Sequence, residues 1–244
     1  MLDSSKLQSP LPREALIAYE GGNEAQRLTS GVGQLEWVRI QELVQCYLRL
    51  PPAVIFDVDG EPGGYSVVIG DARQLDRPGA SVDAVLLFGP RYHLTDRHDR
   101  VTALCEARRI LRDSGLALGV GISRFASPLD GLIRRYLDDP EFGRIVQGVL
   151  TDGQHRNPTN HPGYFSTAFF HYPDELKAEI EEPGLHHECT MAIEGPGWLL
   201  QNFEEHWRDQ ARLERLLSAL PWLEDEPSLL GMSAHMMAIA RKDL

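Results

Sequence analysis

Side chains that can move protons follow the most apolar run of the sequence. Residues Val82–Phe88 (VDAVLLF) are typical of a strand buried on both faces, and Gly89–His93 follow directly. Ligands of open α/β sheets bind at the carboxyl ends of strands, so this segment should face a pocket. We expect Tyr92 and His93 to be catalytic, with the imidazole as general base or acid, and Arg91 to bind an anionic substrate. A packed histidine that is hydrogen-bonded to backbone is the alternative for His93.

A second set of candidate residues lies in the segment 151–172 (TDGQHRNPTNHPGYFSTAFFHY), which has no clear period. Long irregular connections are more often functional lids than filler. We therefore expect a substrate lid whose aromatic and imidazole side chains line a pocket. The substrate-binding candidates are His155, His161, Tyr164, Phe165 and Phe169. The spacing of the histidines matches no common ligand pattern, so we expect no metal site.

A glycine-bearing segment, 53–71 (AVIFDVDGEPGGYSVVIGD), has the beginning of a nucleotide-binding site. An apolar run leads to Asp57 and a glycine loop, but a new apolar run, Val67–Ile69, follows almost at once. A βαβ unit needs roughly 30 residues or more, and the loop is too short to supply one. Asp-Gly and Pro-Gly between two β-rich runs predict a hairpin over residues 53–70.

The elements around these segments alternate between strands and helices. Gly31 and Gly33 divide a helical region over 13–50, which Pro51-Pro52 ends. The expected strands are 53–58, 66–70, 82–88, 116–122, 187–193 and 233–240, and the expected helices are 97–112, 130–150 with a break near 139–140, 173–182 and parts of 200–220. This alternation predicts an α/β layered fold with a mainly parallel sheet. The last two strands are expected to form an antiparallel pair at one edge.

Composition excludes several classes of partner. The chain has 244 residues and a formal net charge of -12, so it lacks the basic surface of a nucleic-acid binder. No apolar run approaches the roughly 20 residues of a membrane span, and the N-terminal residues lack the apolar core of a signal peptide. Three widely spaced cysteines are typical of reduced thiols, which predicts a cytoplasmic protein of one domain.

Four segments together resemble a known family. They are YEGGNEAQRLTSGVGQLEWVRIQELV (19–44), FDVDGEPGG (56–64), GDARQL with VDAVLLFGPRYHL (70–75 and 82–94), and ARRILRDSGLALGVGISRF (107–125). In this order they resemble the small-molecule branch of the class I S-adenosylmethionine-dependent methyltransferases. The resemblance implies a three-layer Rossmann-like fold in a single domain over 1–244. It also implies that residues 1–50 form an N-terminal helical lid.

The resemblance carries a set of cofactor-binding residues onto this chain. The loop after the first strand and the lid helix would close on the methionine end, and Asp71 would contact adenine. The alternative for Asp71 is a helix N-cap or loop role. The residues implied for the cofactor are Asp57, Gly60, Gly63, Asp71, Ala72, Gly89, Tyr19 and Arg27. Glu36 is expected beside them or on a solvated helix face.

Two departures from the family pattern concern the cofactor. Asp59 and Glu61 stand where the family has glycine. The family's helix-strand-helix block, with the acid that binds the ribose hydroxyls, has no counterpart between Val58 and Ser66. We therefore expect a truncated fold, with the hairpin in place of the first βαβ unit, that binds S-adenosylmethionine weakly or not at all. The sheet side that this loss uncovers predicts a homodimer.

Three functions follow as alternatives. The first is a methyltransferase-like small-molecule enzyme of secondary metabolism with impaired or lost cofactor binding. The second is a functional S-adenosylmethionine-dependent methyltransferase with a shortened cofactor site. The third is a non-catalytic partner protein in a dimer. The fold alone does not choose among them.

Overall fold

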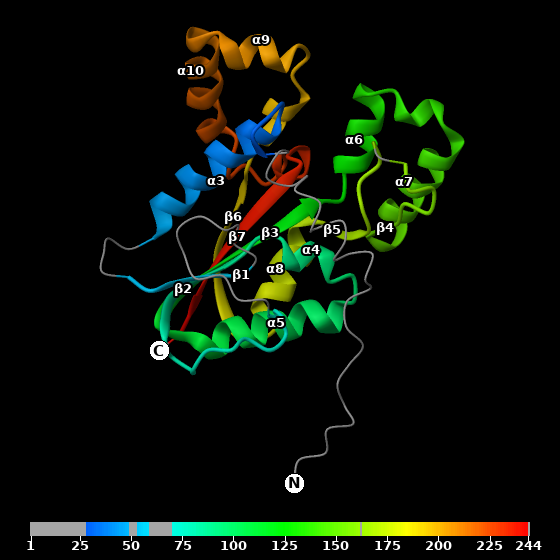
Figure 1. Ribbon diagram of the computed structural model, residues 1–244. Coiled ribbons are helices and arrows are strands. Elements are labelled where there is room, and N and C mark those ends of the chain that lie inside the picture. The colour runs from blue at the N-terminus through cyan, green and yellow to red at the C-terminus, as the bar shows by residue number, and fades with distance from the viewer. Residues whose placement is uncertain (1–27, 49–52, 59–69, 162, 244) are drawn as a thin grey trace.

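Residues 28–48, 53–58, 70–161 and 163–243 are described by a computed structural model, whose strands form one mixed sheet (Figure 1). The strands are β1 (Ile55–Val58), β2 (Val82–Leu87), β3 (Leu111–Ser123), β4 (Gln154–His155), β5 (Ala168–His171), β6 (Leu185–Ala192) and β7 (His235–Lys242). β1, β2 and β3 are parallel neighbours, β7 runs antiparallel to β3, and β6 runs antiparallel to β7. β5 pairs in parallel with the end of β3, and β4 pairs antiparallel with β5.

Helices cover both faces of this sheet. The α-helices are α3 (Gly33–Tyr47), α4 (Pro90–His93), α5 (Arg97–Ile110), α6 (Ala126–Ile133), α7 (Pro140–Asp152), α8 (Pro173–Glu181), α9 (Phe203–Arg208) and α10 (Gln210–Ala219). The short 3-10 helices are η2 (Tyr136–Asp138), η3 (Gly195–Leu199), η4 (Leu220–Trp222) and η5 (Leu230–Met232). The pairs α6–α7 and α9–α10 project beyond the end of the sheet where β3 and β6 have their carboxyl ends (Figure 1). No helix in these described segments is long and apolar enough to cross a membrane.

Two cores lie on opposite faces of the sheet because side chains alternate along each strand. Val85 of β2 packs in the core under α5 and α8, where Leu104 and Ile180 are buried. Leu86 packs on the other side, in the core that contains Phe142 of α7. Near-continuous apolar residues in β2 follow from burial on both faces. The chain thus has the three-layer Rossmann-like α/β fold that was expected.

Most predicted elements are confirmed within a few residues, including β1, β2, α5, α8, β6 and β7. The break near 139–140 is real, because Asp139 ends η2 and caps α7. β3 differs from its prediction: it begins at Leu111 and not at Leu116. A register shift opposite Val82–Ala84 and a positive φ of 61° at Ser114 keep this irregular stretch within the strand.

The structure bears differently on the lid expected over 151–172 and on the hairpin expected over 53–70. Segment 151–172 contributes the buried strand β5 to the sheet, so its end is part of the core and not a free loop. The strand expected at 66–70 and most of the hairpin loop lie outside the described residues, apart from Gly70, which is not in a strand. β1 pairs in parallel with β2.

Candidate functional site

Tyr92 and His93 lie where the strand ends of the sheet converge. β2 ends at Leu87, and α4 carries both side chains immediately beyond it. His235 begins β7 and pairs with Ile122 near the carboxyl end of β3, because β7 is antiparallel. The ring centroid of Tyr92 is 4.8 Å from that of His93 and 6.4 Å from that of His235. The two residues predicted to be catalytic therefore share this edge with a second histidine.

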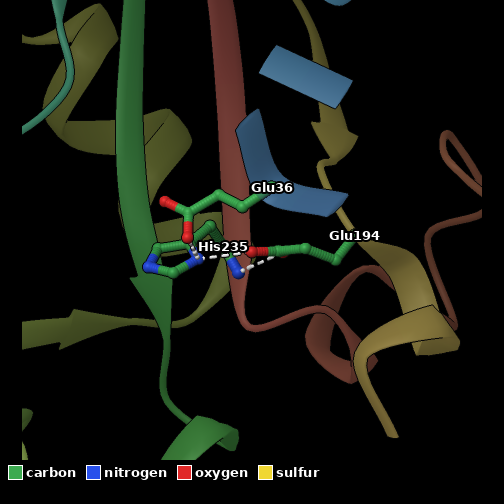
Figure 2. A group of neighbouring side chains, drawn as sticks. All are labelled: Glu36, Glu194 and His235. Atoms are coloured by element: carbon green, nitrogen blue, oxygen red, sulfur yellow. Dashed lines mark hydrogen bonds and ion pairs between the residues drawn. The ribbon is translucent and has the colours of Figure 1, made fainter. Parts of the chain in front are cut away.

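His235 belongs to a buried cluster with two carboxylates, Glu36 and Glu194 (Figure 2). Glu36 comes from α3, Glu194 follows β6, and His235 begins β7. The Nδ1 atom of His235 lies 2.6 Å from Oε1 of Glu194 and 3.7 Å from Oε2 of Glu36. Relative exposure is 5% for Glu36, 2% for Glu194 and 9% for His235. In Figure 2 the second ring nitrogen of His235 points away from both carboxylates.

Backbone and hydroxyl groups fix the Glu194 carboxylate. Its Oε2 accepts hydrogen bonds of 2.9 Å from the Oγ of Ser233 and from the backbone N–H of His235. The Ser233 Oγ in turn accepts from the N–H groups of Glu194 and Gly195. Burial alone would raise the pKa of Glu194. The charge and hydrogen bonds of His235 lower it by more, so the pKa lies below its usual range.

Arg39, one turn along α3 from Glu36, fixes this helix against the end of β6. Its Nε donates to the carbonyl of Ile193 at 3.2 Å. Its guanidinium also pairs with Glu42, at 2.6 Å, and with Glu224. Because Ile193 directly precedes Glu194, this contact sets the position of Glu36 relative to the cluster.

The implied cofactor residues are only partly within the described chain. Tyr19, Arg27, Gly60 and Gly63 lie outside it. Asp57 is in β1 opposite Leu86, while Ala72 and Gly89 are buried.

Asp71 is bound by a neighbour. Its carboxylate accepts from the backbone N–H of Arg73 at 2.8 Å and from the Nη2 of Arg73 at 2.7 Å. These hydrogen bonds hold the pKa of Asp71 below its usual range, although partial burial opposes them. An adenine base would have to compete with this guanidinium for the carboxylate.

Arg91 points into the interior and not toward an open pocket. It is fully buried, and its Nη2 donates to Oε2 of Glu179 at 3.1 Å. Arg100 donates to both oxygens of Glu179, at 2.7 Å from Nη2 to Oε1, and His171 donates from Nε2 at 3.1 Å. Burial lowers the pKa of Arg91 to about 10 and that of His171 to about 4. The Nε and Nη1 of Arg91 and the Nδ1 of His171 have no hydrogen-bond partner. An anionic substrate would reach Arg91 only after rearrangement of this core.

The predicted lid residues hold segment 151–172 together. His155 is buried: its Nδ1 accepts from the Ser127 hydroxyl at 3.0 Å, and its Nε2 donates to the carbonyl of Phe165 at 3.1 Å. Burial lowers the pKa of His155 to about 4, so the ring is neutral at pH 7. The rings of His161 and Tyr164 stack at 4.2 Å between centroids, and the Tyr164 hydroxyl donates to Asp139.

Two grooves open beside this segment, at the start of α5. The larger has a volume of about 420 Å³ and is lined by Thr95, Asp96, Gln154, Arg156, Asn157, Pro158 and Thr167. The second, of about 280 Å³, shares Thr95, Asp96 and Gln154 with it and is lined by Phe169 as well. Of the five predicted lid residues, Phe169 lines a groove, while the other four are not among the lining residues of either.

Sequence reasoning missed Glu194 and His235 as members of a site. They are far apart in the chain and belong to no known spacing motif. The signal was the expected antiparallel pairing of the last two strands, which places the residue after one strand beside the first residue of the other. The backbone N–H of Ile193 indeed donates to the carbonyl of His235.

Comparisons with known proteins agree with this architecture. Residues 54–119 match a family model described as a methyltransferase domain. The fold is similar to that of a "possible histamine N-methyltransferase" from Thermotoga maritima, with 16% identity over 93% of this chain and 99% of that chain, at a TM-score of 0.55. It is also similar to a chain in the complex between the Haloferax volcanii Trm112 methyltransferase activator and the putative methyltransferase, with 10% identity over 97% and 100%, at 0.52.

A Methanosarcina mazei S-adenosylmethionine-dependent methyltransferase matches with 15% identity over 72% of this chain and 66% of that chain, at a TM-score of 0.43. No curated protein matches the chain in sequence. The chain thus contains a segment, residues 54–119, that matches a methyltransferase domain, and its fold is similar to that of methyltransferase structures.

Proposed function

We propose that this chain is a small-molecule enzyme of secondary metabolism on a methyltransferase fold, in which His93 transfers protons and S-adenosylmethionine binds weakly or not at all. The observation that carries the proposal is the convergence of His93, Tyr92 and His235 at the carboxyl edge of the sheet. Ligands of open α/β sheets bind at this edge. Imidazole is the side chain used most often for general acid–base catalysis.

In the proposed reaction His93 takes a proton from the substrate and returns it to another atom of the same molecule. This exchange isomerises or cyclises the substrate without loss or gain of atoms. The Tyr92 ring, tilted by 57° against His93, orients the imidazole. Residues 1–50 and the part of segment 151–172 that precedes β5 are proposed to cover the substrate as lids of a single domain.

Weak cofactor binding has support from both sequence and geometry. Asp59 and Glu61 put negative charge in the loop that the family uses for the methionine carboxylate. Asp71, the implied adenine contact, is held by Arg73. In the described part of the sheet β1 has β2 as its neighbour and no strand on its other side. Among the described residues there is therefore no second strand that could carry the family's ribose-binding acid. These observations support the proposal that S-adenosylmethionine binds weakly or not at all.

A functional methyltransferase is the second candidate. It is favoured by the family match over residues 54–119 and by a fold similar to that of the Thermotoga protein, a possible histamine N-methyltransferase, over 99% of its chain. In that case His93 would take the proton from the acceptor atom as it is methylated. We further propose a cytoplasmic homodimer, and the Haloferax complex is an example of this fold in an assembly with another protein.

The deciding experiment measures thermal stabilisation and turnover of the full chain. S-adenosylmethionine, S-adenosylhomocysteine and a panel of small metabolites are added singly, and each mixture is analysed by mass spectrometry. The proposal predicts a raised midpoint with a metabolite, an isomeric product, and loss of turnover in His93→Asn but not in His98→Asn, an exposed control. A product heavier by one methyl group would overturn it in favour of the second candidate. No stabilisation by any compound would favour a non-catalytic partner.

One double variant separates the two proposed causes of weak cofactor binding. Asp59→Gly with Glu61→Gly removes the charges while leaving the chain length unchanged. If the missing block is the cause, the double variant still fails to bind S-adenosylhomocysteine. Recovery of binding would show instead that the two acidic side chains alone are responsible.

A further inference from the structure

We propose that Glu36, Glu194 and His235 form a binding site for one divalent transition-metal ion. One ligand atom from each of these side chains lies within 4.8 Å of those from the other two. Nδ1 of His235 is close to both Oε1 of Glu194 and Oε2 of Glu36. The three side chains come from separate parts of the sequence and point toward one another inside the protein (Figure 2). The site goes beyond the proposed function and does not depend on it.

The distances between these atoms suit coordination. Bonds of Zn²⁺ to imidazole nitrogen and carboxylate oxygen are about 2.0–2.2 Å long, so neighbouring ligand atoms of a tetrahedral site lie about 3.4 Å apart. The two separations measured from Nδ1, 2.6 Å to Glu194 and 3.7 Å to Glu36, bracket this value. An ion between the three atoms therefore moves the imidazole and the Glu194 carboxylate apart and brings the Glu36 carboxylate closer.

Hydrogen bonds outside the cluster orient the ligands. Ser233 and a backbone N–H hold Oε2 of Glu194, which directs Oε1 at the imidazole. The Ser233 hydroxyl is itself fixed by the N–H of Gly195. Metal ligands in proteins are usually oriented by partners of this kind, and loss of such a partner typically costs 10–100-fold in affinity.

The donor set selects the class of ion. Two carboxylates and an imidazole suit Mn²⁺, Fe²⁺, Co²⁺ and Zn²⁺, whereas Mg²⁺ and Ca²⁺ prefer oxygen donors alone. Three protein ligands leave coordination positions for water or a substrate atom, as in catalytic metal sites. Because Tyr92 is 6.4 Å from His235 between ring centroids, such an ion lies at the edge where the substrate is proposed to bind.

The alternative to a metal site is a buried Glu–His pair with a second carboxylate beside it. In that state Nδ1 keeps its proton and donates it to Glu194. With an ion bound, Nδ1 is unprotonated and ligates the metal. The two states differ in whether the protein takes up metal with defined stoichiometry, which is directly measurable.

The test uses the full chain after chelator treatment and dialysis, titrated with MnCl₂, ZnCl₂ or MgCl₂ alone. Electron paramagnetic resonance measures free Mn²⁺, and elemental analysis after gel filtration measures bound Zn²⁺. We expect one ion per chain for Mn²⁺ and Zn²⁺, no saturable Mg²⁺ binding, and a raised unfolding midpoint. Glu194→Gln and His235→Asn should weaken binding at least tenfold, while Glu188→Gln and His186→Asn on the exposed part of β6 leave it unchanged.

Absence of saturable Mn²⁺ or Zn²⁺ uptake by the wild-type chain would overturn the proposal. Uptake that is the same in Glu194→Gln and His235→Asn would overturn it too. Glu36→Gln serves if either of those variants does not fold, because it lies on a helix and keeps the side-chain shape. All readouts are independent of catalysis, so failure of the metal site and failure of the proposed function are distinguishable.

Discussion

Replacing Glu179 by glutamine tests how the buried charges beneath the sheet are balanced. Glu179 is 3% exposed and is the acceptor for Arg91, Arg100 and His171. Arg91 and Arg100 are 0% and 1% exposed. Glu179→Gln keeps the shape of the side chain but leaves two buried guanidinium groups without this counter-charge. Loss of one partner from a buried ion pair costs about 3–5 kcal/mol.

We therefore expect the free energy of unfolding to fall by about 3–5 kcal/mol in Glu179→Gln, measured by urea denaturation with circular dichroism. For a chain of this length the midpoint of thermal unfolding should fall by roughly 6–20 °C. Glu182→Gln is the matched control, because Glu182 directly follows α8, the helix that carries Glu179, and pairs with Arg97 at the surface. Its expected change is within about 0.5 kcal/mol. A loss below about 1 kcal/mol in Glu179→Gln would refute this charge balance.

Replacing Arg91 by methionine in the same cluster should not destabilise the protein, in contrast to Glu179→Gln. Arg91 gives Glu179 one hydrogen bond and leaves its Nε and Nη1 without partners, while Arg100 binds both carboxylate oxygens. An apolar side chain of similar length removes the buried, incompletely paired charge and keeps the Arg100–Glu179 pair. We expect stability within about 1 kcal/mol of wild type, or higher. A loss as large as that of Glu179→Gln would show that Arg91 is required for folding.

Two further predictions concern pH and backbone conformation. Burial lowers the pKa of His155 and His171 to about 4, so between about pH 4 and 6.5 these histidines bind more protons in the unfolded chain than in the folded chain. The free energy of unfolding should therefore rise with pH across this window, by up to about 3 kcal/mol for each histidine. A flat curve of this free energy against pH, measured by urea denaturation, would contradict the prediction. Gly153→Ala should lower stability by about 2–4 kcal/mol, because φ is +79° and the new Cβ would lie 2.6 Å from the Phe169 ring. In Gly143→Ala, inside α7, the new Cβ meets no atom within 4 Å, so stability should rise by about 0.5–1 kcal/mol. Equal thermal midpoints for the two variants would refute this reasoning.

The apolar pattern was sufficient to predict the central strands and their flanking helices. β2 is apolar except at Asp83 because both of its faces are buried, and the spacing of apolar residues in α5 follows its single buried face. The antiparallel pair β6–β7 was also predictable, from two late strands joined by a helical excursion. These features depend on local periodicity, which the sequence shows directly.

The orientation of Arg91 was not predictable from its position after β2. The sequence places it among groups that face a pocket, and Tyr92 and His93 do lie at that edge. Room for its guanidinium comes from Gly119 on β3, where a Cβ would lie 3.0 Å from Nη1, and its counter-charge comes from Glu179 on α8. Both partners are distant in sequence, and no local pattern reports the pairing.

The cluster of Glu36, Glu194 and His235 was not predicted for a related reason. Its members belong to three elements, and their meeting depends on the register of β7 against β3 and β6. Strand assignment predicts that the last two strands pair, but a register change of one residue would turn His235 to the other face. The sequence therefore contains the elements of the site without fixing which side chains meet.

The central proposal is that the chain keeps a methyltransferase fold but binds S-adenosylmethionine weakly or not at all. Isothermal titration calorimetry of the full chain with S-adenosylhomocysteine tests it most directly, since this product is stable and usually binds the family's site. We predict no saturable heat up to about 1 mM ligand, equivalent to a binding free energy weaker than about -4 kcal/mol. A one-to-one isotherm with a micromolar Kd would contradict the account and identify a working methyltransferase.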